Sequence, residues 1–445
     1  MQRTTRPVWR LMALLALLAL TAAACGGGGG KKNAATTGTT SKAAPARGNV
    51  DGILKIGILA PQTGDLAALG PPQFKGAELA IKEINDAGGV LGKPIQSVEA
   101  DDGGASNTDL ANTNADRMIT SDKVDAITGA ASSGTTKAII DKVTGAGVVE
   151  CSPSNTSSEL STISSNNGGY YFRTAPPDNL QGPALADVIT GDGHSKIGII
   201  ARNDSYGVGF GQSLSAALKK NGATIVGGGV VAYDPKGTAF DADVKKITDA
   251  NPDAIALISF PDTGGLIIKT LIQQGHGPDK TPLYTADGMQ TNSLTSKVDP
   301  NNPASVKAIK GTVPSGTPQG GAPSFPAAYK AFAPGADDTF AAHAFDCITV
   351  IALAAQEAKS DDSAKIHAHI IDVTKDGTKC TSFADCKRLL DQGKDIDYDG
   401  ASGPLHFVQT SVGGAEPSQG TYDVYAFGAD GKTSALPGKQ VKVGN

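Results

Sequence analysis

Leu54-Lys55-Ile56-Gly57-Ile58-Leu59-Ala60 is an apolar run with the length of one β-strand. Apolar residues then recur three or four positions apart, as on one face of an α-helix: Phe74, Ala77, Ile81 and Ile84. Gly88-Gly89 predicts the end of this helix, since glycine accepts the left-handed conformation of a C-cap. A strand followed by such a helix predicts the first unit of a parallel sheet that helices cover.

The alternation of strands and helices continues and then starts again. Further strands are predicted at 95–98, 126–128 and 148–149, with a helix over 136–144. Lys196-Ile197-Gly198-Ile199-Ile200-Ala201 repeats the motif of Lys55–Ala60, and Asp253-Ala254-Ile255 repeats Asp125-Ala126-Ile127. We therefore expect an α/β protein with two doubly wound, parallel-sheet lobes joined by a hinge. Ligands bind at the carboxyl ends of such strands, so the two sheets would share one cleft.

The domain organisation follows from this repeat. We expect a signal peptide, a tether and two lobes, each lobe built from two chain segments. The expected boundaries are 1–24 for the signal peptide, 25–50 for a lipidated cysteine and flexible tether, 51–173 plus 291–415 for lobe I, and 174–290 plus 416–445 for lobe II.

The N-terminus has the features of an export signal. Three arginines precede the apolar run Leu11–Leu20, which is too short to span a bilayer as a helix, and Ala22-Ala23-Ala24 follows it. Cys25 comes next and resembles the lipidated cysteine of a bacterial lipoprotein; the alternative is cleavage after Ala24 that leaves a free thiol. We expect a lipid anchor on the outer face of the cell membrane, with residues 26–50 as a flexible, cationic tether.

Composition excludes several classes of protein. The 445 residues carry a formal net charge of −5, which argues against a nucleic-acid partner, because such proteins need basic surface. The apolar fraction of 39% is too high for a disordered chain, and the glycines have no three-residue period of the collagen type.

Four cysteines remain after the N-terminal segment. Cys380 and Cys386 are close in sequence, and we expect them to form a local disulfide in an oxidising compartment. Whether Cys151 pairs with Cys347 stays open. No CxxC motif and no suitably spaced histidine is present, so we expect no metal site.

Signatures of catalysis are missing. The sequence has no GxSxG, HExxH or Walker A motif, and no candidate base has a nucleophile beside it. We therefore expect a protein that is not an enzyme and needs no cofactor.

Polar loops at the ends of predicted strands indicate a binding site instead. Gly129–Gly134 and Ser152–Thr156 offer hydroxyl and N–H donors in lobe I, and the first of these opens a helix whose N-terminus suits a carboxylate. Asp204-Ser205-Tyr206 and Ala286-Asp287-Gly288 offer acids and an aromatic ring in lobe II. Each loop alone also reads as an ordinary cap or turn; their joint placement favours a site.

An ordered series of motifs resembles the Leu/Ile/Val-binding-protein family, which consists of extracytoplasmic substrate-binding proteins of ABC importers with the type I periplasmic-binding fold. The series covers residues 52–430 and includes Leu54–Gly64, Ile84–Gly89, Asp101–Gly104, Ser152-Pro153-Ser154, Phe172–Pro176, Arg202–Gly207, Asn251–Ala254, Ala286–Gly288 and Ser402–Leu405.

The resemblance implies roles for individual residues. Ser133 and Thr156 stand where the family binds an amino-acid α-carboxylate, and Ser154 stands where it offers a backbone carbonyl to the ammonium. Asp287 matches the acid that pairs with the α-ammonium, and Tyr206 matches the tyrosine that closes over the ligand from lobe II.

Four further positions match residues at or near the cleft. Phe260 and Leu69 flank the ligand side chain in the family, and Asp178 and Gln181 follow the first crossing between lobes. Two departures concern the identity of the ligand: Asn155 replaces a small residue beside Thr156, and Leu69 stands where some amino-acid binders have an aromatic ring.

The leading hypothesis is a monomeric, lipid-anchored solute-binding protein. It would capture an amino acid of the branched-chain type, or a related small amide, and deliver it to an ABC permease. The alternatives are a surface ligand sensor that uses the same fold without transport and a hydrolase of cell-envelope substrates. The missing nucleophile–base pair disfavours the hydrolase.

Overall fold

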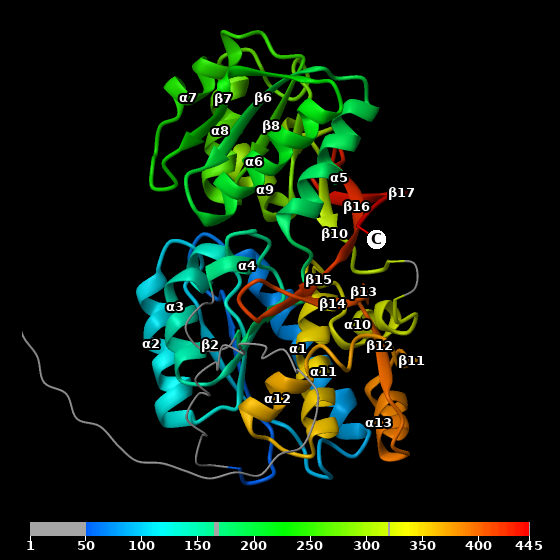
Figure 1. Ribbon diagram of the computed structural model, residues 1–445. Helices are drawn as coiled ribbons and strands as arrows, with labels where there is room; N and C mark the ends of the chain where they lie inside the picture. The colour runs from blue at the N-terminus through cyan, green and yellow to red at the C-terminus, as the bar shows by residue number, and fades with distance from the viewer. Residues whose placement is uncertain (1–49, 164–168, 319–320, 445) are drawn as a thin grey trace, which may run out of the picture. The chain divides into compact units, whose positions relative to one another are not determined.

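The computed structural model describes residues 50–163, 169–318 and 321–444, which belong to one compact unit, Ser41–Asn445 (Figure 1). The expected signal peptide, Cys25 and nearly all of the tether lie outside the described residues. Within the described ranges, no helix combines the length and hydropathy that a membrane span requires.

The first of two seven-stranded sheets forms the centre of lobe I. Its strands, in spatial order, are β14 (Phe407–Gln409), β15 (Ala415–Pro417), β5 (Tyr171–Arg173), β4 (Val149–Ser152), β3 (Ala126–Gly129), β1 (Lys55–Ala60) and β2 (Gln96–Asp101). β2, β1, β3, β4 and β5 are parallel, and only β14 runs antiparallel to its neighbour β15. This is a doubly wound sheet, as the repeat of strands and helices predicts.

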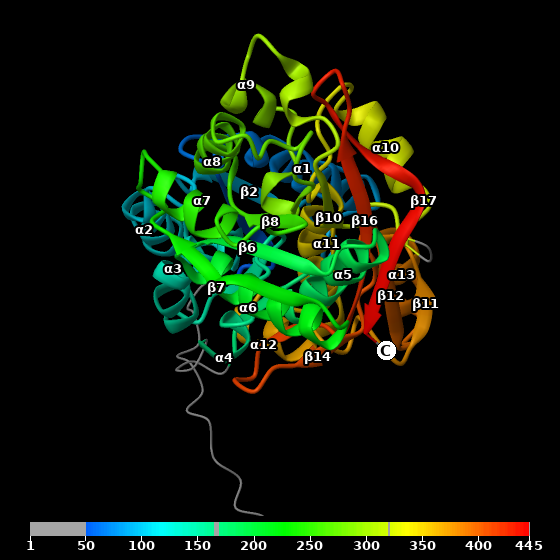
Figure 2. The same cartoon turned by 90° about the horizontal axis from the view of Figure 1, so that it is seen from above.

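The second sheet repeats this order in lobe II. Its strands are β17 (Thr433–Gly444), β16 (Gln419–Phe427), β10 (Lys310–Pro314), β9 (Leu283–Thr285), β8 (Ala254–Ile258), β6 (Lys196–Arg202) and β7 (Thr224–Tyr233). In Figure 2, β7, β6 and β8 lie side by side, and the two red strands β16 and β17 lie at the other edge. β16 is antiparallel to both β10 and β17.

Helices cover both sheets. Those packed with lobe I are α1 (Gly70–Asp86), α2 (Thr108–Arg117), α3 (Ser133–Gly145), α4 (Leu160–Ile163), α10 (Phe325–Phe332), α11 (Ala341–Ala358), α12 (Ser363–His369) and α13 (Phe383–Asp391). Those of lobe II are α5 (Asp178–Gly191), α6 (Ser205–Lys220), α7 (Asp241–Thr248), α8 (Pro261–Gln273) and α9 (Leu294–Val298). A small sheet of β11 (Thr378–Cys380), β12 (Ile396–Gly400) and β13 (Gly403–Pro404) lies beside α13.

Local predictions agree well with these bounds. The apolar run at 54–59 forms β1, and the stripe from Phe74 to Ile84 is the buried face of α1, which packs against α11 (Figure 1). Gly88 and Gly89 both have positive φ, and the Gly89 N–H bonds to the carbonyl of Ile84, so they end α1 as expected.

Two expected boundaries are wrong. The smaller error is at 415, because β15 of the first sheet continues to Pro417. We expect residues 291–415 in lobe I, but β10 pairs with β9 and β16 of the second sheet. Leu294, Val298 and Val306 also pack in the apolar core of lobe II. The chain therefore leaves lobe II only after Pro314, because the short strand β10 completes that sheet.

Lobe I contains two disulfide bonds. The structure joins Cys380 to Cys386, as expected, and also joins Cys151 to Cys347, which the sequence left open. The second bond connects β4 to α11 inside the main apolar core.

Candidate functional site

A nearly closed cavity of about 20 Å³, room for about one water molecule, lies at the carboxyl ends of the parallel strands, so a larger ligand enters only when its walls move apart. Its walls come from the loops after β1 and β3 and the start of α1 in lobe I, and from the start of α6 and the loops after β8 and β9 in lobe II. The lining residues are Leu66, Leu69, Gln73, Ala131, Ser132, Ser133, Ser154, Tyr206, Phe260, Asp287, Gly288 and Phe340. The cavity thus lies where doubly wound sheets bind ligands.

The structure brings most of the expected site residues to this cavity. Six of the nine line it: Leu69, Ser133, Ser154, Tyr206, Phe260 and Asp287. The other three, Thr156, Asp178 and Gln181, are fully buried and are not among the lining residues.

The lobe I wall is built on the N-terminus of α3. Ser132 caps the helix by accepting a hydrogen bond from the Thr135 N–H at 3.0 Å, and the Ser133 hydroxyl accepts one from the Ser157 N–H at 3.3 Å. The carbonyl of Leu59 would lie 1.8 Å from a Cβ at Gly129, so only glycine lets β3 enter this loop. The N-terminal end of a helix dipole, lined by serines, favours an anionic group.

The loop after β4 supports this wall through Asn155. Its side-chain amide donates to the carbonyls of Ala131 at 2.9 Å and Ala130 at 3.2 Å, and its oxygen accepts from the Tyr171 hydroxyl at 3.0 Å. Ser154 donates to the Ala131 carbonyl at 2.9 Å. The departure from a small residue at position 155 therefore has a structural reason, because Asn155 ties two loops of the site together.

The lobe II wall presents a carboxylate and aromatic rings. Asp287 follows β9, and its Oδ1 accepts hydrogen bonds from the Tyr206 hydroxyl at 3.0 Å and from Gln181 Nε2 at 3.1 Å. Burial raises the pKa of Asp287 to about 6, and these donors partly offset that rise. The rings of Tyr206 and Phe260 stack with centroids 5.2 Å apart. Asp287 is thus a rigidly held acceptor against an aromatic wall.

The three buried residues contact Asp287 or one another. Gln181 donates from one nitrogen to Asp287 and to the Thr312 carbonyl, and the Asp178 N–H bonds to the Thr156 carbonyl at 2.7 Å. The carboxylate of Asp178 is fully buried beside the Thr156 hydroxyl. Burial first, and then the charge of Asp287, raise the pKa of Asp178 well above its usual range.

Three lining residues were missed by sequence reasoning: Leu66, Gln73 and Phe340. Gln73 lies on α1 and accepts a hydrogen bond from Ser154 at 3.4 Å, and its only sequence signal is a polar residue beside the apolar stripe. Phe340 precedes α11 with a φ of 62°, an unusual backbone conformation for a bulky residue. No local pattern connects residue 340 to loops 200 residues earlier in the chain.

The side chains that line the cavity are mostly apolar groups and hydroxyls. The lining set described above contains no histidine, lysine, arginine or cysteine. The acidic side chain of that set is Asp287, whose Oδ1 accepts hydrogen bonds from Tyr206 and Gln181. Over the described part of the chain, no group of three or more His, Cys, Asp or Glu side chains is placed to hold a metal ion.

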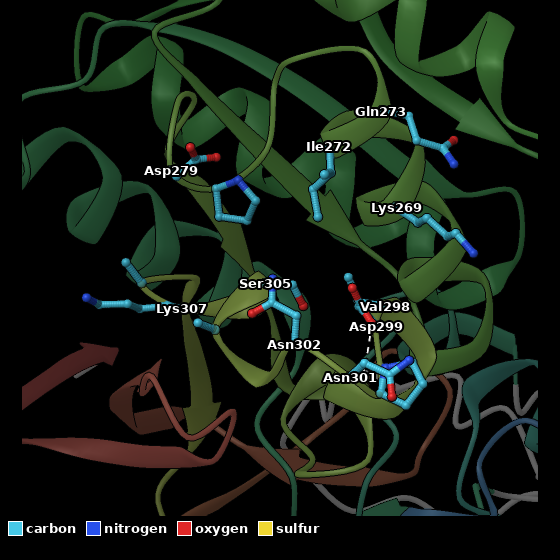
Figure 3. Close-up of a pocket in the computed structure, with 14 residues that line it drawn as sticks. Lys269, Ile272, Gln273, Asp279, Val298, Asp299, Asn301, Asn302, Ser305 and Lys307 are labelled. Atoms are coloured by element: carbon cyan, nitrogen blue, oxygen red, sulfur yellow. Dashed lines mark hydrogen bonds between the residues drawn. The ribbon is translucent and has the colours of Figure 1, made fainter.

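A larger cavity of about 820 Å³ lies elsewhere in lobe II (Figure 3). It is lined by the C-terminal part of α8, with Lys269 and Ile272, and by the segment Val298–Ala308. It shares no lining residue with the loops at the strand ends. Its wall mixes both charges without a convergent set of donors, so the smaller cavity is the candidate site.

Comparison with known proteins agrees with this geometry. The profile of the periplasmic binding protein family matches residues 53–410. The chain is 28% identical over 272 residues to Leu/Ile/Val-binding protein homolog 3 of Brucella melitensis, covering 58% of this chain and 71% of that protein. It is also 28% identical over 283 residues to the leucine-specific-binding protein of Salmonella typhimurium, covering 60% and 74%.

Solved structures share the fold at lower identity. A leucine-binding protein of Thermotoga maritima superposes with a TM-score of 0.70 at 20% identity, covering 88% of this chain and 99% of that one. A Rhodopseudomonas palustris solute-binding protein in complex with 4-hydroxybenzoate superposes with a TM-score of 0.69 at 17% identity, covering 88% and 98%. With two α/β lobes, a cavity at the strand ends and a family match over most of its length, this chain belongs to the periplasmic binding protein family.

Proposed function

We propose that this protein is the substrate-binding component of an ABC importer and that it captures an α-amino acid with an apolar side chain, of the branched-chain type. The observation that carries the proposal is the polarity of the cavity. A helix N-terminus with serines lies on one wall, and the buried carboxylate of Asp287 lies on the other. A zwitterion carries the complementary charges at its two ends.

Individual roles follow from this polarity. Ser133 and the N-terminus of α3 would bind the α-carboxylate, and Asp287 would pair with the α-ammonium beside the carbonyl of Ser154. Leu69, Phe260 and Tyr206 would enclose the apolar side chain; they are buried and belong to one apolar cluster. Thr156, Asp178 and Gln181 would act from behind, since Gln181 fixes the orientation of Asp287.

A hydroxylated aromatic acid is the second candidate. The stacked rings of Tyr206 and Phe260 favour an aromatic ligand, and the hydroxyl of such a ligand would donate to Asp287. The two candidates differ in charge, because an aromatic acid brings no cation to Asp287. Asp287 therefore favours the amino acid.

The location and partners extend the proposal. Residues 1–50 carry the signal, Cys25 and the cationic tether, so we propose export, lipid anchoring at the outer face of the membrane and delivery to a membrane permease. The ligand-sensing alternative uses the same cavity and differs only in the partner.

Calorimetric titration tests the ligand class. We expect leucine, isoleucine or valine to bind and 4-hydroxybenzoate not to bind. Asp287→Asn should weaken amino-acid binding by about 2–5 kcal/mol, because it leaves a buried ammonium without its counterion. Asp262→Asn is the matched control, since Asp262 is a half-exposed carboxylate of lobe II that pairs with Lys297. Binding of hydroxybenzoate alone would replace the first candidate with the second, and no heat with either class would reject both.

A further inference from the structure

The end of β6 carries a buried arginine whose contacts reach both lobes. Arg202 is 3% exposed, and its Nε donates to Asp204 Oδ2 at 2.7 Å within lobe II. Its Nη2 lies 3.6 Å from Oδ2 of Asp65, which belongs to the loop after β1 in lobe I. One guanidinium therefore holds a carboxylate of its own lobe and a carboxylate of the other lobe.

The same guanidinium supports the aromatic wall of the cavity. Its central carbon lies 4.1 Å from the ring centroid of Phe260, a cation–π distance. The Phe260 ring in turn stacks on the ring of Tyr206, and the Tyr206 hydroxyl donates a hydrogen bond to Asp287. A continuous series of contacts thus connects Asp65 on lobe I to the carboxylate that faces the cavity.

Asp65 is itself held firmly in lobe I. Its Oδ1 accepts hydrogen bonds from the N–H groups of Ala105 at 2.9 Å and Ser106 at 3.1 Å, which leaves Oδ2 for Arg202. The next residue, Leu66, lines the cavity and packs in one apolar cluster with Tyr206 and Phe260. The charged contact and the apolar contact between lobes are therefore adjacent.

The two ion pairs of Arg202 differ in whether they require contact between the lobes. The pair with Asp204 lies within lobe II and is independent of lobe closure. The pair with Asp65 exists only while the loop after β1 touches β6. Both partners are largely shielded from water, with side-chain exposures of 3% and 14%, so this pair is screened less than a surface ion pair.

We propose that Asp65, Arg202 and Phe260 form an interlobe latch: Arg202 positions the aromatic wall and ties it to lobe I, so that this ion pair sets the lifetime of the closed, ligand-holding state. The latch deepens the proposed function and rests on it for the ligand. Its effect on lobe closure does not depend on the identity of the ligand.

Small-angle scattering of the ligand-free protein tests the closure. Asp65→Asn keeps an oxygen for Ala105 and Ser106 but removes the charge that faces Arg202. We expect a larger radius of gyration than in the wild type, because the closed state loses population. Asp192→Asn is the control, since Asp192 pairs with Lys310 at 2.7 Å inside lobe II and should leave the radius unchanged. Equal radii for the wild type and Asp65→Asn would overturn the latch.

A double-mutant cycle tests the pair itself, with leucine and isoleucine as probes. Asp65→Asn should speed ligand dissociation about tenfold. In an Arg202→Gln background the same change should have almost no effect, because its partner is already gone. Additive effects would also overturn the latch. If neither probe binds but the radius changes as expected, the proposed ligand fails and the latch stands.

Discussion

The two lobes share a strand order but differ in the chemistry of their loops. In each, the central parallel strands lie in the order second, first, third, fourth and fifth along the chain. The corresponding loops of lobe I present serine hydroxyls and a helix N-terminus, whereas those of lobe II present Asp287, Tyr206 and Arg202. Topology therefore fixes where the strand ends meet, and the loop residues fix the chemistry that each lobe presents there.

The lobes also differ in covalent support. Both disulfides lie in lobe I, and no disulfide joins described residues of lobe II. Cys151–Cys347 joins segments 196 residues apart, whereas Cys380–Cys386 closes a loop of six. Lobe I is thus built from two distant segments that are fixed to each other independently of the ligand.

We expect the largest change in stability on removing the Cys151–Cys347 disulfide. Replacing Cys151 and Cys347 with serine should lower the free energy of unfolding by about 5 kcal/mol, because the unfolded chain regains the entropy of a long loop. Denaturant unfolding measures it. The Cys380→Ser, Cys386→Ser variant is the control, and its shorter loop predicts a loss of about 2 kcal/mol. Equal losses would show that loop entropy does not govern the stability of lobe I.

A smaller effect should appear in lobe II as a dependence on pH. The pKa of Asp287 is raised to about 6 by burial, and a bound ammonium would lower it, so binding releases a proton below that pH. Affinity for leucine should therefore rise about tenfold from pH 5 to pH 7 and level off above. Titration in buffers of different ionisation enthalpy measures the released proton.

The same titrations on Asp287→Asn provide the control for this dependence. The variant has no carboxyl group at this position, so the rise with pH should disappear with it. A rise that persists would assign the proton to another buried group, such as Asp178.

We expect the smallest change in ligand affinity on removing one serine hydroxyl of lobe I. Ser133→Ala should weaken leucine binding by about 1 kcal/mol, the usual contribution of one hydrogen bond. Ser132→Ala is the matched comparison, because the Ser132 hydroxyl is already engaged with the Thr135 N–H. It should lower stability by about 1 kcal/mol through loss of the helix cap and change affinity less. The reverse pattern would exchange the roles of the two serines.

Much of the site could be predicted because its residues follow strands that have strong local signals. Asp287 and Tyr206 follow strands within a few residues, and Ser133 opens a helix after another strand. Which of the expected site residues line the cavity, and which are buried away from it, could not be predicted. Thr156 and Asp178 also follow strands, yet they are fully buried and do not line the cavity, since the direction of a side chain beyond a strand end depends on the neighbouring loops.

Local patterns in the sequence predict the strands and helices around Lys55–Ala60 and Lys196–Arg202, the repeat of two lobes and the polar loops, because apolar periodicity and glycine caps act over a few residues. Local patterns do not predict that β10 belongs to lobe II, that Cys151 bonds to Cys347 or that Arg202 reaches Asp65. Each of these joins residues far apart in the chain. The packing of whole lobes, rather than any local pattern, sets such contacts.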